Sequence, residues 1–150
     1  MLNEDYKEML QILLNNEVKF LVVGAYAMGA HGYPRATGDF DIWVEASEVN
    51  SRKIYKSLSE FGVPLFDITE KTFTEKGIFF QIGVAPRRIV ITTHIDGVVF
   101  EEAYRTKELI DIENLQIPFI SKENLIKNKQ STGRKKDRLD VEYLKKNKNI

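Results

Sequence analysis

Two aspartates one residue apart constrain this chain more than any other feature of its sequence. In residues 39–44 every second side chain is apolar, at positions 40, 42 and 44, which is the period of a β-strand. Successive side chains of a strand point to opposite faces, so Asp39 and Asp41 share one face, with their Cα atoms about 6.5–7 Å apart. Neighbouring carboxylates repel each other, and a bound divalent cation is the usual reason for such a pair. The sequence therefore predicts a strand that carries a cation site.

The residues before this strand predict a turn that can approach a phosphate group. The run Phe20–Val23 is continuously apolar and rich in β-branched residues, which indicates a buried strand. Gly24 ends the run, and the small residues 25–30 favour a short helix. Glycine lets the backbone come close to a ligand, and the free N–H groups at the start of a helix attract anions. A loop rich in glycine and proline, residues 31–38, then leads to the two aspartates.

The rest of the pattern predicts helices and strands in mixed order, without an internal repeat. Apolar side chains recur at helical spacing in several segments, and continuous or alternating apolar runs indicate strands in others. We expect helices over residues 4–14 and 50–61, a helical turn over 100–104, a helix that begins after Ser121, and a last helix over 135–145. We expect further strands over residues 78–84, 88–93 and 115–120. This mixture predicts an α+β fold in which helices cover a central sheet.

Two details of this pattern make specific predictions about position. Pro118 lies within the last expected strand and has no backbone N–H, which predicts that this strand lies at an edge of the sheet. On the last expected helix, Leu139, Tyr143 and Leu144 are the side chains that we expect to point inward.

The composition fits one domain that spans residues 1–150, and it limits the environment of the chain. A chain of 150 residues with 43% hydrophobic residues can bury one core. The sequence has no cysteine, which excludes disulfides and thiolate metal sites. It has no apolar run of about 18 residues that would span a membrane, and its first residues lack the basic start of a secretion signal. We therefore expect a cytoplasmic protein.

The charges are unevenly distributed, although their sum is zero. The predicted helical segment 121–150 holds ten Lys or Arg and four Asp or Glu. Such a segment is either a solvated helix face or a surface for phosphates, RNA or an acidic partner. The same two interpretations apply to Lys129, Arg134 and Lys136 individually.

The order of strand, Gly24-Ala25, short helix, loop and Asp39-Phe40-Asp41 resembles the nucleotidyltransferase superfamily with the DNA polymerase β-like fold. The signature of that superfamily is Gly-Gly or Gly-Ser at a helix start, followed by Asp-x-Asp or Asp-x-Glu on a strand. The sequence is more similar still to small bacterial proteins described as nucleotidyltransferases, through motifs that span nearly the whole chain. These motifs are His31-Gly32-Tyr33-Pro34-Arg35, residues 39–44, residues 80–84, Ile95-Asp96-Gly97, residues 100–103, Asn128-Lys129 and residues 132–137. The resemblance implies a polymerase β-like α+β fold with a mixed central sheet flanked by helices.

The resemblance also implies roles for four residues. Asp39 and Asp41 would be the catalytic carboxylates and would bind Mg²⁺ or Mn²⁺. Gly24 and Ala25 would bind the triphosphate of a nucleotide through their backbone N–H groups.

Other residues of the same region have two interpretations each. Arg35 is a candidate to clamp a triphosphate with its two-pronged guanidinium, or it makes a surface ion pair. Thr37 is a candidate nucleotide contact, or it stabilises the loop. His31 contacts substrate or packs in the loop, and Trp43 lines the cleft or belongs to the core.

The chain departs from the superfamily pattern at two positions. Ala25 replaces the second Gly or Ser, which removes a hydroxyl contact to phosphate. More seriously, the related group has a third carboxylate in a segment resembling Arg-Ile-Asp-Ile-Leu-Thr, and here Val90 stands in its place within residues 88–93. That carboxylate completes a two-metal site and helps to deprotonate the attacking hydroxyl. None of four nearby polar residues is an obvious replacement: Glu45, Gln81, His94 and Asp96.

Three functional hypotheses follow. The first is an enzyme that moves a nucleoside monophosphate from a nucleoside triphosphate to a hydroxyl of a small molecule, a protein or an RNA, with a homodimer or a partner protein completing the cleft. The second is a catalytically degenerate module that binds a nucleotide or a partner, because Val90 removes the third carboxylate. The third is RNA binding through residues 121–150, which lack the interleaved aromatic residues of many RNA-binding surfaces.

Overall fold

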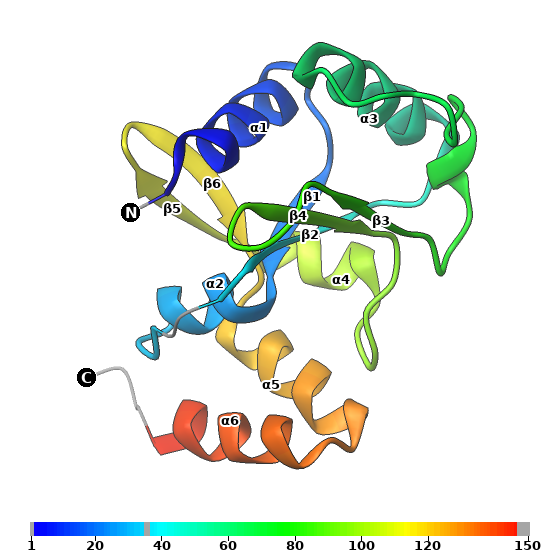
Figure 1. Cartoon of the computed structure of the whole chain (residues 1–150). Helices are drawn as coiled ribbons and strands as arrows, with labels where there is room; N and C mark the ends of the chain where they lie inside the picture. Colours follow the sequence, from blue (N-terminus) through cyan, green and yellow to red (C-terminus); the bar gives the residue numbers. More distant parts are fainter. Residues whose placement is uncertain (1, 35–36, 147–150) are drawn as a thin grey trace.

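The computed structural model describes residues 2–34 and 37–146, which form helices and strands in mixed order (Figure 1). The helices are α1 (Glu4–Asn15), α2 (Gly24–Ala30), α3 (Glu48–Phe61), α4 (Phe100–Arg105), α5 (Lys122–Thr132) and α6 (Lys135–Lys146), with one short 3-10 helix, η1 (Thr72–Thr74). The strands are β1 (Phe20–Val23), β2 (Asp39–Val44), β3 (Phe79–Ile82), β4 (Arg88–Thr92), β5 (Glu108–Ile112) and β6 (Leu115–Phe119). Every predicted helix and strand is present. No helix in the described part of the chain is long and apolar enough to cross a membrane.

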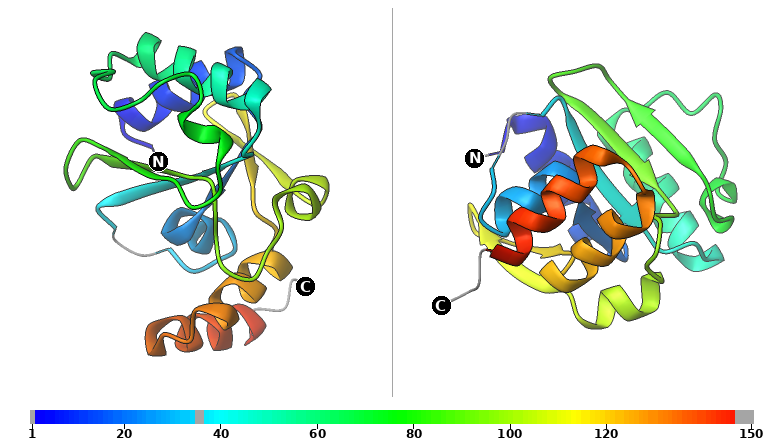
Figure 2. Two further views of the ribbon diagram at one scale, coloured as in Figure 1. Left: turned by 90° about the vertical axis from the view of Figure 1, so that its right-hand side faces the viewer. Right: turned by 90° about the horizontal axis from the view of Figure 1, so that it is seen from below.

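The strands form one mixed six-stranded sheet in the order β3-β4-β2-β1-β6-β5. β2 is antiparallel to β1 and parallel to β4, while β6 is parallel to β1. Helices α1 and α3 cover one face of the sheet, and α2, α4, α5 and α6 lie on the other side (Figures 1 and 2). This arrangement confirms the predicted α+β class with a mixed central sheet, and it places the strand with the two aspartates in the middle of that sheet.

The face of the sheet beneath α1 holds a closely packed aromatic cluster. The ring of Tyr6 on α1 stacks on Phe40 of β2, with ring centroids 4.7 Å apart. The Tyr6 hydroxyl donates hydrogen bonds to the backbone oxygens of Pro86 and Arg88, at 3.0 and 3.1 Å, which ties α1 to the start of β4. Because side chains alternate along β2, burying Phe40 on this face directs both aspartates to the other face.

The strand β6 is not an edge strand, so the prediction from Pro118 is wrong. β5 pairs antiparallel with β6 on the outer side, in a hairpin whose turn residues Glu113 and Asn114 have positive φ angles. The N–H of Ile120 donates to the Val22 oxygen, so the nitrogen of Pro118, two residues earlier, faces β1 as well. The proline therefore limits the ladder between β1 and β6 to one register pair, Val22 with Phe119, and does not move the strand outward.

The inward face of α6 also differs from the prediction. Leu144 is buried as expected, but Leu139 and Tyr143 are about half exposed. The positions that face the protein carry Asp137 and Asp140 instead, each 2% exposed. Buried carboxylates require compensating charge, and α5 supplies it in the form of a lysine described below.

Candidate functional site

Asp39 and Asp41 lie on β2, which is flanked by β1 and β4. The register pairs Asp41 with Val23 of β1 and with Val90 of β4, and it pairs Asp39 with Arg88 of β4. Paired residues of neighbouring strands point to the same face, so Val90 lies beside Asp41 and Arg88 lies beside Asp39. The Arg88 side chain uses this position to donate from Nε to Oδ1 of Asp39.

The turn from β1 into α2 brings the backbone of Gly24 against the carboxylate of Asp41. Gly24 has a φ of +70°, and a Cβ atom added to it would lie 2.2 Å from Asp41 Oδ2. Only glycine adopts this conformation without strain, and only a residue without a side chain leaves room for the carboxylate. The group that lies against Gly24 is thus a carboxylate of the same chain, and the approach of a ligand phosphate to this backbone stays a prediction.

A cleft of about 260 Å³ surrounds the two aspartates. Its walls come from the start of α2, the loop before β2, β2 itself and the α5–α6 hairpin. Seen from below, the hairpin passes in front of α2 (Figure 2). The residues that line it are Gly24, Ala25, Met28, Thr37, Asp39, Asp41, Lys129, Arg134, Lys136 and Asp137. The predicted residues of the first half of the chain are thus brought together with cationic residues about 90 positions later.

The two carboxylates differ in electrostatic environment. Burial and, to a smaller extent, the charge of Asp39 together raise the pKa of Asp41 from 3.8 to about 6, against the opposite effect of Arg88 and Lys129. Asp39 has a direct cationic partner in Arg88, whereas no hydrogen bond or ion pair joins Asp41 to another described residue. A carboxylate that is largely buried yet lacks a partner is suited to binding a cation.

Lys129 of α5 lines the same cleft, and its charge acts on Asp41. Its side chain is 12% exposed, and its Nζ lies 3.3 Å from Asp137 Oδ1 and 2.9 Å from Asp140 Oδ2, both on α6. Asp137 also accepts hydrogen bonds from Thr132 Oγ1 at 2.6 Å and from Arg134 Nε at 2.7 Å. Thr132 and these charge-assisted bonds lower the pKa of Asp137 against the effect of its burial. This network holds the α5–α6 hairpin closed.

The basic residues of this hairpin had two interpretations, as solvated charges on a helix face or as contacts for phosphates, RNA or an acidic partner. Lys129 is not a solvated surface charge, because it lies within the buried network and lines the cleft. Arg134 and Lys136 line the same cleft, and Arg134, whose side chain is 73% exposed, forms the intrahelical ion pair with Asp137 three residues later.

Sequence reasoning did not identify Arg88 as part of the site, although a signal for it was present. Arg88 precedes Val90 by two residues, as Asp39 precedes Asp41 by two. Once Val90 is placed beside Asp41, the period of two along parallel strands requires Arg88 to lie beside Asp39.

The position expected for a third carboxylate is occupied by a buried side chain. Val90 is 3% exposed and directly beside Asp41. Gln81 lies one strand further from Asp41, opposite Val90, and Glu45 contacts Lys19 at the far end of β2. His94 and Asp96 contact each other at 3.4 Å. Within residues 2–34 and 37–146, no group of three or more His, Asp or Glu side chains is placed to hold a metal ion.

The donor set therefore fits one divalent cation more closely than two. Asp39 and Asp41 provide carboxylate oxygens on one face, and the remaining ligands would come from water and from a bound phosphate, as Mg²⁺ prefers. The two-metal arrangement that the family resemblance implies lacks its third carboxylate here.

The other predicted residues of this region have distinct positions. Ala25 and Thr37 line the cleft, and the Thr37 hydroxyl also accepts a hydrogen bond from the Asp39 N–H at 3.1 Å, so this residue stabilises the loop. His31 does not line the cleft, because its Nε2 lies 2.8 Å from the Ile120 oxygen. Trp43 is 2% exposed and packs edge-on against a phenylalanine of α4, so it belongs to the core. Arg35 lies outside the described residues.

Comparisons with known proteins identify the fold. Neither models of protein families nor curated protein sequences match this chain. A search of solved structures finds TM1012 from Thermotoga maritima, a protein to which nucleotidyltransferase activity is ascribed. The two chains are 21% identical, the match covers 97% of this chain and 94% of that one, and the TM-score is 0.59. The similarity extends over the whole chain and confirms a nucleotidyltransferase-like fold.

The contact between Gly24 and Asp41 predicts a specific cost of substitution. Gly24→Ala combines a strained positive φ with an overlap against Asp41, and we expect it to lower the free energy of unfolding by about 2–4 kcal/mol. Gly133→Ala is the matched control, since Gly133 has a φ of +72° with nothing within 4 Å of its added Cβ. The control should lose only about 1 kcal/mol. Equal losses in urea denaturation would show that the carboxylate does not constrain position 24.

The raised pKa of Asp41 predicts a pH dependence of stability. The pKa of Asp41 is about 6 in the folded protein and 3.8 ordinarily, so between these pH values the folded state binds a proton that the unfolded state has released. The ionised carboxylate therefore destabilises the fold above pH 6, whereas below pH 4 this residue has no such effect. We expect Asp41→Asn to raise the free energy of unfolding by about 2 kcal/mol at pH 8 in metal-free buffer, and to leave it unchanged at pH 3.5.

Urea denaturation across this pH range provides the measurement. Asp67→Asn, a change at an exposed aspartate, is the control and should follow the wild-type profile. An Asp41→Asn profile parallel to that of the wild type would contradict the raised pKa.

Proposed function

We propose that this protein is a metal-dependent nucleotidyltransferase that moves a nucleoside monophosphate from a nucleoside triphosphate to a hydroxyl of an acceptor. The observation that carries the proposal is the placement of Asp41, held against the backbone of Gly24 with no hydrogen bond or ion pair to another described residue, in a cleft lined by Asp39 and three cationic side chains. This combination suits a phosphate chain that arrives together with a divalent cation. The nucleotidyltransferase-like fold supports the same class of reaction.

Asp39 and Asp41 are the residues that would hold Mg²⁺ or Mn²⁺ in this proposal. When bound, the cation supplies charge neutralisation for the phosphate oxygens. The two aspartates must be ionised to bind it, so Asp41, with a pKa of about 6, makes binding weaken as the pH falls below 6.

The remaining cleft residues bind and position the phosphates. The backbone of Gly24 and Ala25 at the start of α2 offers N–H groups, and Lys129, Arg134 and Lys136 offer positive charge from the α5–α6 hairpin. Arg88 neutralises Asp39 and so limits the repulsion between that carboxylate and the triphosphate.

The reaction itself is a substitution at the α-phosphorus. The acceptor oxygen forms a bond to this phosphorus while the bond to the bridging oxygen breaks and pyrophosphate leaves, and the proton of the acceptor hydroxyl passes to solvent. The neighbour of Asp41 that would accept this proton in the superfamily is Val90 here. Loss of a general base costs about 10²–10⁴-fold in rate, so we expect a slow enzyme.

The test is transfer of label from α-labelled nucleoside triphosphates into a cell extract, with Mg²⁺ or Mn²⁺. We expect label to appear with the wild-type protein and to fall by more than about 100-fold with Asp39→Asn/Asp41→Asn, because the cation ligands are lost. The exposed change Asp67→Asn should leave transfer unchanged. Equal labelling by the double variant would place the reaction outside this cleft.

A second candidate is a module that binds a nucleotide without transferring it. The surroundings of the two carboxylates on β4 favour this candidate. The apolar side chain of Val90 is buried beside Asp41, and the cationic side chain of Arg88 is paired with Asp39, so neither is a third carboxylate.

Val90→Asp distinguishes the two candidates. If the protein is an impaired enzyme, the new carboxylate should raise the rate of transfer by about 10-fold or more. Val90→Asn is the matched control, since it has the same shape and no charge, and it should not raise the rate. Metal-dependent nucleotide binding by the wild type, with no transfer by the wild type or by Val90→Asp, would establish the binding module.

A further inference from the structure

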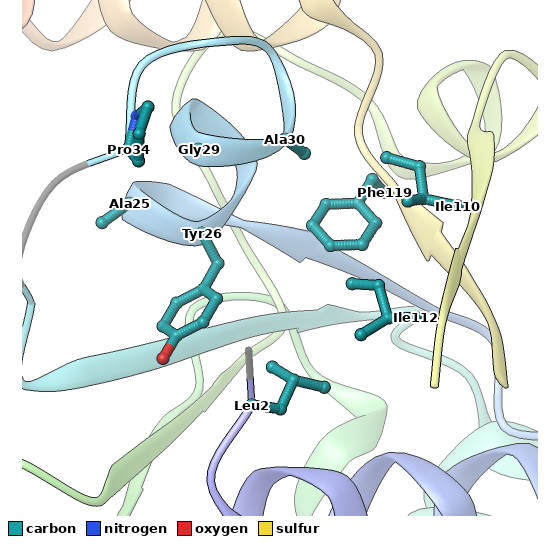
Figure 3. Close-up of a pocket in the computed structure, with 9 residues that line it drawn as sticks. All are labelled: Leu2, Ala25, Tyr26, Gly29, Ala30, Pro34, Ile110, Ile112 and Phe119. Carbon is teal, nitrogen blue, oxygen red and sulfur yellow. The ribbon is translucent and has the colours of Figure 1, made fainter. Parts of the chain in front are cut away.

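The two edges of the sheet differ in charge. β5 forms one edge and β3 forms the other. On β5, Ile110 and Ile112 face an apolar cavity of about 400 Å³ beside α2 (Figure 3), while Glu108 and Asp111 are exposed. Charged side chains on an edge strand discourage another strand from pairing with it. The β5 edge therefore carries the usual protection against association with a second copy.

The β3 edge has no such protection. Residues 77–86, which include the whole of β3, contain no charged side chain, although 29% of the chain is charged. The strand is nevertheless at the surface, since Phe79 is 63% exposed and Gln81, on the same face, is exposed as well. Val84, in the turn after β3, is 76% exposed. An uncharged and largely apolar edge is a surface on which a further strand can add to the sheet.

The pairing of β3 with β4 shows which backbone groups of this edge are free. The N–H of Thr93 donates to the Ile78 oxygen at 3.0 Å, so these two residues form a hydrogen-bonded pair. Bonded and non-bonded pairs alternate along an antiparallel ladder, so Phe80 bonds to β4, while the N–H and C=O groups of Phe79 and Gln81 point outward. These four outward groups make no hydrogen bond to another described residue.

We propose that β3 pairs antiparallel with β3 of a second copy of this chain, about a two-fold axis at Gln81. In this register Gln81 faces Gln81 of the second copy in a hydrogen-bonded pair that uses the free N–H and C=O groups of both. Their side-chain amides lie on one face, where each can donate to and accept from the other. On the opposite face Phe80 meets Ile82 of the second copy, so two apolar side chains are joined.

The charges that flank β3 suit the same register. Glu75 lies six residues before Gln81 and Arg87 six residues after it, and both are exposed. Antiparallel pairing brings Glu75 of one copy and Arg87 of the other to the same end of the new ladder, and it sets Lys76 against the uncharged Pro86. Parallel pairing would instead set each charge beside its own copy, which is unfavourable. The edge is therefore complementary to itself in the antiparallel sense.

This interface is separate from the carboxylate cleft. The strand β4 lies between β3 and the strand that bears Asp39 and Asp41, so the dimer leaves the cleft of each copy as it is. The inference therefore does not rest on the proposed function. A two-fold pairing uses the β3 edges of both copies and leaves the protected β5 edges outside, so assembly closes at two copies.

The test is the mass of the whole chain in sedimentation velocity over a series of concentrations. We expect a wild-type dimer that dissociates on dilution. Gln81→Lys sets two like charges against each other across the axis, from an exposed position, and should weaken dimerisation by about tenfold or more. Leu109→Lys, which adds the same charge at a 58% exposed position of β5, is the matched control and should dimerise as the wild type does.

A mixture of two variants separates this interface from a general loss of folding. Gln81→Lys and Gln81→Glu should each be largely monomeric, and their mixture should restore the dimer because opposite charges then face each other across the axis. A wild type that is monomeric throughout, or one that binds only a different protein through β3, would overturn the inference. A dimer that survives in Gln81→Lys, or one that mixing does not restore, would overturn it as well.

The absence of cysteine from the sequence allows an independent measurement of the register. Gln81→Cys should form a disulfide between two copies under mild oxidation, because Cα atoms of a hydrogen-bonded pair are about 5.5 Å apart. Leu109→Cys, on the other edge, should remain uncrosslinked. A wild-type dimer in which Gln81→Cys does not crosslink would contradict the axis at Gln81 and overturn the inference.

Discussion

The contact between the Gly24 backbone and the Asp41 carboxylate is the constraint on which the rest of the site depends. Asp41 Oδ2 occupies the space that a side chain at position 24 would need, so the turn from β1 into α2 can form only with glycine. The same contact buries the carboxylate, which contributes to its raised pKa. One steric relation thus restricts position 24 to glycine and helps to bury the central acid of the cleft.

The positive charges near Asp41 and Asp39 come from side chains of the protein itself, and they are shared unequally between the two carboxylates. Arg88 pairs with Asp39 on the neighbouring strand, while Lys129 is shared between two buried aspartates of α6 and acts on Asp41 only at a distance. The hairpin of α5 and α6 is held closed by that lysine network, so a cation that serves the fold also faces the cleft. Among the described residues, Asp41 has no direct ion-pair partner, which is the basis for proposing it as a ligand of a divalent cation.

Local periodicity explains what the sequence determined by itself. The alternation in residues 39–44 placed both aspartates on one face, and the apolar run before Gly24 predicted the buried strand and its turn. The position of Val90 followed from the family resemblance, and the register of β4 on β2 places it beside Asp41. Tertiary structure alone decided the pairing of Arg88 with Asp39, the closure of the cleft by Lys129, and the place of the strand with Pro118 inside the sheet between β1 and β5. These features depend on which distant segments of the chain pack together, and a pattern with a period of a few residues does not encode such contacts.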